Sequence, residues 1–290
     1  MYDSFWNYFK KSFKLIFQKP ILFVPTLISL ALSIVFTLGI IASIGVPDSI
    51  VSLNIGMISL ILLGVLIMIV LELFISAGNF NMIKQAVDIN EVSMDDFWVG
   101  AKKYTGRIFL GGLIFSGILL LVLLIIVVPV ILTKSSGLTI TLLILFSIPV
   151  IIFILFISLW ETILVYEDCN IIKSFKLSFS FVKKHFGLVF VINLLQAIFT
   201  NDKNSHKNGD NGASINLPFH SKHGGKTYNL HVFGKYIPFS IGTIGVISIL
   251  ITIIKAFLSL YFEVIFFVIY HDRRKSIFND GNGFNDLEAD

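Results

Sequence analysis

The chain has 290 residues, of which 56% are hydrophobic and 14% are charged, and its mean hydropathy is +0.88. A soluble domain of this length could not bury so much apolar surface, so the composition excludes a soluble globular protein and indicates an integral membrane protein. The formal net charge is +4, and the single cysteine, Cys169, cannot form an intramolecular disulfide.

Five apolar stretches reach the roughly 20 residues that a helix needs to cross a hydrocarbon core of about 30 Å. In chain order they are residues 21–46, 50–75, 108–132, 138–166 and 237–270. A sixth stretch, 186–199, is short for a span, and we expect that helix to be tilted or extended. Lipid permits only helices and closed barrels, and these runs lack the alternation of barrel strands. We therefore predict an all-α, polytopic transmembrane helical bundle with six spans.

A short motif that precedes the first span returns before the third. Its residues are Asp3, Phe5, Trp6, Lys10 and Lys11 in the first copy and Asp95, Phe97, Trp98, Lys102 and Lys103 in the second. A looser copy without the tryptophan is centred on Lys183 and Lys184. On a helical projection the aromatic side chains share one face and the lysines another, as in a helix lying in the headgroup layer. The sequence predicts three repeated hairpins, each preceded by an amphipathic interfacial helix.

The basic and aromatic residues of these segments are candidate lipid-headgroup residues. They are Trp6, Lys10, Lys11, Trp98, Lys102, Lys103, Lys183 and Lys184. Each lysine near an anionic surface contributes about 1 kcal/mol. Two interpretations stay open: the helices only anchor and orient the spans, or they form a platform that recognises a lipid headgroup or a soluble partner. Three separated clusters make no surface that fills a nucleic-acid groove, so we expect no nucleic-acid partner.

We interpret the chain as a single six-span membrane domain over residues 1–275. Its repeats cover about 1–80, 90–168 and 170–275, with a polar extracytoplasmic insertion at 200–236 and an acidic polar tail at 276–290. Lysine and arginine number 15 before the first span, in the second and fourth loops and after the last span, against six in the other loops. Five of those six lie in the connection at 200–236, and long loops weigh less in the positive-inside rule. The positive-inside rule then predicts a multi-pass protein of the cell membrane with both termini in the cytoplasm.

Four ionisable residues lie within the predicted spans. They are Glu72, Glu161, Glu263 and Lys255, and each glutamate lies in the second span of its repeat, toward the cytoplasmic side. Such groups are costly in lipid and face a bundle interior or a water-filled cavity. One interpretation makes them proton or ion sites in a pathway, with Lys255 pairing a glutamate across the bundle. The other, which we favour at this point, is that each glutamate reaches water or caps a neighbouring basic helix.

No known catalytic motif or metal motif is present. Phosphate-binding loops, HExxH pairs, serine-nucleophile elbows and dinucleotide fingerprints are all missing from the sequence. Four histidines in the insertion, His206, His220, His223 and His231, invite a metal hypothesis, but they have no cysteine or carboxylate in fixed register. We expect no metal, no cofactor and no enzymatic activity.

One segment resembles a stretch found in a broad prokaryotic group of membrane proteins. Its residues are Glu167, Asp168, Ile171, Ser174, Phe175, Ser178, Phe179, Lys183, Lys184, His185 and Phe186. A second resemblance covers Ala77, Gly78, Phe80 and Ile83 together with residues 96–104. The group comprises the six-helix membrane domain found beside glycerophosphodiester phosphodiesterases and its relatives of unknown function in archaea and Gram-positive bacteria. The resemblance implies a six-helix bundle and no established activity, because this chain lacks a phosphodiesterase domain.

Three functional hypotheses follow. The leading one is a scaffold or accessory protein in envelope or lipid-related processes, with membrane lipids and other membrane proteins as partners. The second is a small transporter or permease component that uses the intramembrane carboxylates, and the third is an intramembrane lipid-processing enzyme. Geometry discriminates between them, since glutamates that converge on a wet pocket favour the second or third and glutamates dispersed around the rim favour the first.

Overall fold

The computed structural model describes residues 4–44, 55–133, 136–200, 228–232, 235–239 and 241–278. Its elements are α1 (Phe5–Gln18), the 3₁₀ helix η1 (Pro20–Leu22), α2 (Phe23–Ile44), α3 (Ile55–Asp88), α4 (Met94–Thr133), α5 (Ser136–Ile157), α6 (Trp160–Tyr166), α7 (Ile171–Lys184), α8 (Phe186–Thr200), β1 (Tyr228–Val232), β2 (Lys235–Phe239), α9 (Ile241–Arg273) and α10 (Lys275–Phe278). Among the described residues, the regular structure is helical apart from the antiparallel hairpin of β1 and β2.

Five helical segments are long and apolar enough to cross a membrane. They are Pro20–Thr37, Ser59–Asp88, Met94–Ile125, Pro149–Tyr166 and Leu250–Phe278. A sixth crossing results if α7 and α8, which are bent by 103° relative to each other, count as one span. The architecture is that of a helical membrane protein with several spans, as composition and hydropathy predict.

The second predicted interfacial segment is not a helix of its own. It forms the start of α4, which continues without a break to Thr133. Ser93 and Asp96 begin this helix as a capping box, in which the Ser93 amide donates to Asp96 Oδ2 at 2.8 Å. The first segment does end, because Pro20 follows α1 and proline cannot continue a helix. The segment before the third span has no proline and runs straight into it.

The predicted fourth span, 138–166, is broken in two. The last turn of α5 ends at Ile157, and α6 begins only at Trp160. Side chains of neighbouring helices contact the groups near the break: Ser178 Oγ donates to the Phe156 carbonyl at 2.9 Å, and Asn193 Nδ2 donates to Ser158 Oγ at 3.3 Å. Such partners make an interrupted helix tolerable at membrane depth.

The third unit is irregular, as the short sixth stretch predicts. Helix α8 has only 15 residues and meets α7 at a sharp bend. Residues 201–227 of the predicted insertion and 279–290 of the predicted tail lie outside the described residues. The first residues of the predicted tail are helical, however, and Ser276 and Ile277 of α10 are buried against the bundle.

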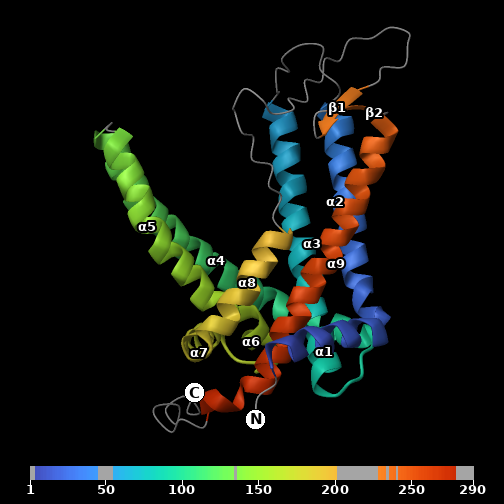
Figure 1. Cartoon of the computed structure of the whole chain (residues 1–290), viewed down its shortest axis with the longest axis vertical. Coiled ribbons are helices and arrows are strands. Elements are labelled where there is room, and N and C mark those ends of the chain that lie inside the picture. Colours follow the sequence, from blue (N-terminus) through green and yellow to red (C-terminus); the bar gives the residue numbers. More distant parts are fainter. Residues whose placement is uncertain are drawn as a thin grey trace.

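Figure 1 shows how the helices are arranged. Helices α2, α3 and α9 run side by side, whereas α4 and α5 form an arm that diverges from them. Helices α1, α6, α7 and α10 gather at the end of the molecule opposite the β hairpin. The buried core also lies at this end, in the second halves of α3 and α9 and in α6 and α7. We call it the base of the bundle.

Candidate functional site

A polar cavity of about 460 Å³ lies between α2, α3 and α9, with the last residue of α8 at its edge. Its polar lining residues are Thr26, Ser29, Ser33, Glu72, Ser76, Asn79, Thr200, Thr252, Lys255, Ser259 and Glu263. All of these lie on helices that are apolar enough, alone or in a bent pair, to cross a membrane. Hydroxyl, amide and charged groups are therefore gathered inside the spans, and we call this space the polar cavity.

Glu72 on α3 is held by serines of α2. The hydroxyl of Ser29 lies 2.9 Å from Oε1 and 2.8 Å from Oε2, and the Ser33 hydroxyl lies 3.3 Å from Oε1. The two serines are four residues apart and so occupy the same face of α2. The two serines hold the Glu72 carboxylate at the contact between α2 and α3.

Glu263 on α9 is bonded to the same face of α3, two turns after Glu72. Asn79 Nδ2 donates to Glu263 Oε2 at 2.9 Å, and Ser259 Oγ lies 3.5 Å from Oε1. The Asn79 side chain is 6% exposed, and its Oδ1 atom has no hydrogen-bond partner among the described residues. A buried carbonyl oxygen without a donor is costly unless another group or a ligand supplies one.

Glu161 does not line the polar cavity. It lies in the first turn of α6, is partly buried, and is close enough to Glu263 for their charges to interact. Lys255 lies two turns before Glu263 on α9 and lines the cavity together with Glu72 and Glu263. Of the four predicted intramembrane charges, the structure thus brings three to one cavity and the fourth beside it.

A mostly apolar groove adjoins the cavity between α2 and α3. It also has a volume of about 460 Å³ and is lined by Phe36, Val65, Met68, Ile69, Glu72, Leu73 and Ser76. Glu72 and Ser76 line both spaces. The carboxylate of Glu72 therefore stands where a polar space meets an apolar one, and we call the second space the apolar groove.

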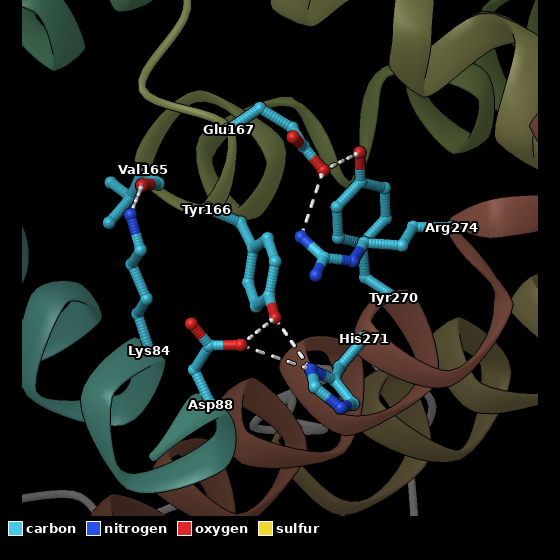
Figure 2. Close-up of polar contacts among 8 residues, drawn as sticks. All are labelled: Lys84, Asp88, Val165, Tyr166, Glu167, Tyr270, His271 and Arg274. Atoms are coloured by element: carbon cyan, nitrogen blue, oxygen red, sulfur yellow. Dashed lines mark hydrogen bonds and ion pairs between the residues drawn. The ribbon is translucent and has the colours of Figure 1, made fainter. Parts of the chain in front are cut away.

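A network of ionisable and aromatic side chains ties α3, α6 and α9 together at the base of the bundle (Figure 2). The Tyr166 hydroxyl donates to Asp88 Oδ1 at 2.8 Å and lies 2.5 Å from His271 Nδ1, which is 3.6 Å from the same carboxylate oxygen. Lys84 Nζ donates to the Val165 carbonyl at 3.1 Å. We call these residues, with those of the next paragraph, the base network.

Glu167 and Asp168 extend the network to α4 and to the end of α9. Glu167 accepts a hydrogen bond from the Tyr270 hydroxyl at 2.9 Å and lies 3.8 Å from the Arg274 guanidinium (Figure 2). Asp168 is bonded to Lys103 at 2.5 Å and to Arg107 at 3.0 Å. Burial alone would raise the pKa of Asp168, but these two cations outweigh it and hold the pKa below its ordinary value.

Helix α1 is joined to the base by a similar arrangement. The Tyr8 hydroxyl donates to Asp272 Oδ2 at 2.5 Å and accepts from Arg273 Nε at 2.9 Å. Burial, together with the bond to Asp272, raises the pKa of Tyr8 to about 12. Burial also raises the pKa of the Cys169 thiol to about 11, which disfavours the reactive thiolate at neutral pH.

The candidate headgroup residues lie at the base, mostly exposed. Trp6 is 62% exposed and Trp98 51%, and Lys10, Lys11, Lys102, Lys103, Lys183 and Lys184 are exposed as well. Lys103 bonds Asp168, and Lys184 donates to the Ser276 carbonyl at 2.6 Å. On α1 the side chains buried against the bundle are Tyr8, Ser12 and Ile16. Trp6, Phe13 and Phe17 stay at least half exposed, although the rings of Phe13 and Phe17 also contact Tyr261 and Phe257 of α9.

Sequence reasoning missed the base network and the hydroxyl lining of the cavity. The signal for the network was the set of ionisable residues at span ends, such as Asp88, Glu167 and His271. The signal for the cavity was the pair Ser29 and Ser33, one turn apart in an apolar run. Of the four histidines of the metal hypothesis, His206, His220 and His223 lie outside the described residues, and only the backbone of His231, on β1, is described. Comparison of the chain with family models, curated proteins and solved structures found no match.

Proposed function

We propose that the chain is a small membrane transporter or permease component, and that the polar cavity between α2, α3 and α9 is its solute site. The observation that carries this proposal is the convergence of Glu72, Glu263 and Lys255 on one cavity that is also lined by hydroxyl groups. Dispersed glutamates at the rim would instead favour a scaffold. The cavity volume of about 460 Å³ lies in the usual range for small-molecule sites.

The energetic cost of this lining supports a functional role. An ionisable side chain inside a span costs about 2.5–3.5 kcal/mol on insertion scales, and such residues are concentrated on solute and ion pathways. Four charged residues in or beside one cavity are more than packing requires, because apolar residues of similar size would fill the same space at lower cost. The proposal treats the chain as a non-enzymatic protein.

Cysteine accessibility tests the proposal. Ser259→Cys places a thiol in the polar cavity, and Leu63→Cys, whose parent side chain is 58% exposed on a span, serves as the lipid-facing control. Both are made in a Cys169→Ser background and reconstituted in vesicles. A transporter exposes its site to each side in turn, so Ser259→Cys should react with impermeant thiol reagents added from either side while Leu63→Cys stays unreactive. Reaction from neither side, or from one side only, would contradict the proposal.

The architecture that accompanies this proposal has six crossings, arranged as three hairpins, with both termini in the cytoplasm of a cell-membrane protein. It is supported by the basic residues of α1, α4 and α7 at the base, the end where α10 also lies. The resemblance to the six-helix domain beside glycerophosphodiester phosphodiesterases implies the same number of spans. Reporter fusions at residue 215 and at the C-terminus test the orientation, since the proposal requires opposite sides.

A second candidate function is binding of anionic lipid at the base, as an anchor or scaffold. The exposed Trp6 of α1 and the exposed Lys10, Lys11 and Lys102 favour it. Replacing these lysines with Gln should reduce the anionic lipid that copurifies with the protein. Unchanged lipid retention would remove this candidate and leave the cavity proposal intact.

A further inference from the structure

The two spaces that meet at Glu72 differ in character. The polar cavity on one side carries the charged and hydroxyl groups, and the apolar groove on the other is lined by Phe36, Val65 and other apolar residues of α2 and α3. Glu72 and Ser76 are shared by both linings. A ligand that occupies both spaces must have a polar end and an apolar end, with the polar end at Glu72.

The polar cavity is lined by more carboxyl groups than cationic groups. Two carboxylates, Glu72 and Glu263, share it with one ammonium group, that of Lys255, and the Glu161 carboxylate lies close behind Glu263. The buried Asn79 Oδ1 adds an acceptor that has no partner among the described residues. A single positive charge with N–H donors complements this set, because it pairs with the Glu72 carboxylate and supplies hydrogen bonds to the unpartnered acceptor.

Glu72 is oriented by its neighbours and can still accept hydrogen bonds from such a partner. A carboxylate has room for about four hydrogen bonds, whereas the hydroxyls of Ser29 and Ser33 can donate only one each. The two serines fix the carboxylate orientation and leave acceptor capacity on it. A carboxylate held in this way binds an ammonium group without having to be ordered first.

The apolar groove is suited to a hydrocarbon tail. Besides Glu72 and Ser76, its lining consists of Phe36, Val65, Met68, Ile69 and Leu73. Val65 and Ile69 are 37% and 47% exposed on the outer surface of a span. A tail therefore reaches the groove from the lipid, where an amphiphile is already concentrated. A fully hydrated cation such as a metal ion would leave this half of the site empty.

We propose that the site takes an amphiphilic amine, with its ammonium group bound in the polar cavity at Glu72 and its apolar chain in the apolar groove. The inference rests on the proposed function in that this amine is the solute of the transporter. The same chemistry is offered by a free alkylamine and by the amine-bearing headgroup of a membrane lipid. The experiment separates these two sources.

The test measures the thermal unfolding midpoint of the full chain in nanodiscs of phosphatidylglycerol. Hexylamine should raise the midpoint in a saturable way, whereas 1-hexanol, which lacks the charge, and ethylamine, which lacks the chain, should have little effect. A second set of nanodiscs contains phosphatidylethanolamine without added amine. A raised midpoint there, with no further gain from hexylamine, assigns the site to the lipid headgroup, and a gain from hexylamine alone assigns it to a free amine.

Matched variants locate the effect. Glu72→Gln should weaken hexylamine binding roughly tenfold or more, because a charge-assisted hydrogen bond is lost. Glu91→Gln makes the same chemical change at an exposed position outside the cavity and should bind as the parent does. If Glu72→Gln folds poorly, Ser29→Ala should still weaken binding severalfold by releasing the carboxylate.

Two results would overturn the proposal: equal stabilisation by hexylamine and 1-hexanol, or full hexylamine binding in both Glu72→Gln and Ser29→Ala. Neither bears on the proposed function itself, which stands or falls on the accessibility of Ser259→Cys from both sides of the membrane. A transporter with an accessible cavity that ignores hexylamine and phosphatidylethanolamine would carry a different solute.

Discussion

The polar cavity and the base network are built from the same kinds of residue but pair them differently. In the base network each carboxylate has a charged or histidine partner: Asp88 has His271, Glu167 has Arg274, and Asp168 has Lys103 and Arg107. In the cavity the hydrogen bonds accepted by Glu72 and Glu263 come from neutral serine and asparagine groups. Paired groups hold helices together, whereas incompletely paired groups are available to a ligand.

The difference has a consequence for stability. Substitutions at the base should lower the free energy of unfolding, and substitutions of the cavity charges should affect binding far more than folding. Packing supports the same division, because the buried core lies at the base. The first half of α3, the second half of α4 and helix α5 instead expose many large apolar side chains.

The largest effect is expected where α3 and α4 approach most closely. A Cβ atom at Gly100 would overlap the Cβ atom of Asn81, whose Nδ2 donates to the Asp96 carbonyl at 2.8 Å. Gly100→Ala should therefore lower the free energy of unfolding by about 1–3 kcal/mol, the usual cost of overpacking. Gly106→Ala is the matched control, because a Cβ atom there meets nothing within 4 Å. It should stabilise the helix by about 0.5–1 kcal/mol. Equal stabilities of the two variants in detergent would show that the base is not tightly packed.

A smaller effect is expected in the base network. Tyr166→Phe removes the hydroxyl that joins Asp88 of α3 to His271 of α9. Loss of hydrogen bonds to a charged group should lower the free energy of unfolding by about 1–2 kcal/mol. A double-mutant cycle with Asp88→Asn isolates the contact, and the two effects should be less than additive. Strict additivity would mean that Asp88 and Tyr166 do not stabilise each other.

Much of the fold could be predicted from the sequence, because lipid leaves few choices. Hydropathy and length locate the long apolar helices, and the short sixth stretch predicts an irregular span there, although not its sharp bend against α7. The continuity of the second repeated segment with α4 was missed, because an amphipathic pattern gives no information on whether the chain turns after it. The break at Ser158 and Leu159 was missed as well, because it depends on partners such as Ser178 and Asn193 that lie on other helices.

Of the candidate site, only the charged residues could be predicted from the sequence. Glu72, Glu263 and Lys255 stand out in apolar runs, but their convergence on one cavity depends on the rotation of α3 and α9 about their axes. Ser29, Ser33 and Asn79 are ordinary polar residues in a sequence, and nothing marks them until their bonds to the glutamates are known. The base network depends on contacts between residues far apart in the chain, such as Tyr166 and His271.

The pairing of Asp168 should make stability depend weakly on pH. Because its folded-state pKa is lower than the ordinary value of 3.8, the stabilisation is present above that value and is lost as the pH falls through the folded-state pKa. The side chain is 40% exposed, so solvent screens the pair and the effect should be below about 1 kcal/mol. Asp168→Asn tolerates the positive φ of 50° at this position and removes the charge. The parent should be more stable than this variant at pH 6 and equal to it near pH 2. A difference that does not shrink on acidification would mean that the ion pairs contribute nothing.

The smallest effect on folding is expected for Glu72→Gln, although it changes a charge inside a span. The variant keeps the shape of the side chain, and its amide can still accept a hydrogen bond from Ser29 or Ser33. It also removes the cost of holding a carboxylate at membrane depth. The free energy of unfolding should therefore stay within about 0.5 kcal/mol of the parent or rise, measured in the absence of any amine. The contrast with Tyr166→Phe is the sharpest test of the division between the two regions. If Glu72→Gln instead destabilised the protein as much as Tyr166→Phe does, Glu72 would be a structural tie between α2 and α3 like the carboxylates of the base network. The main reason to infer that the polar cavity binds a ligand would then be removed.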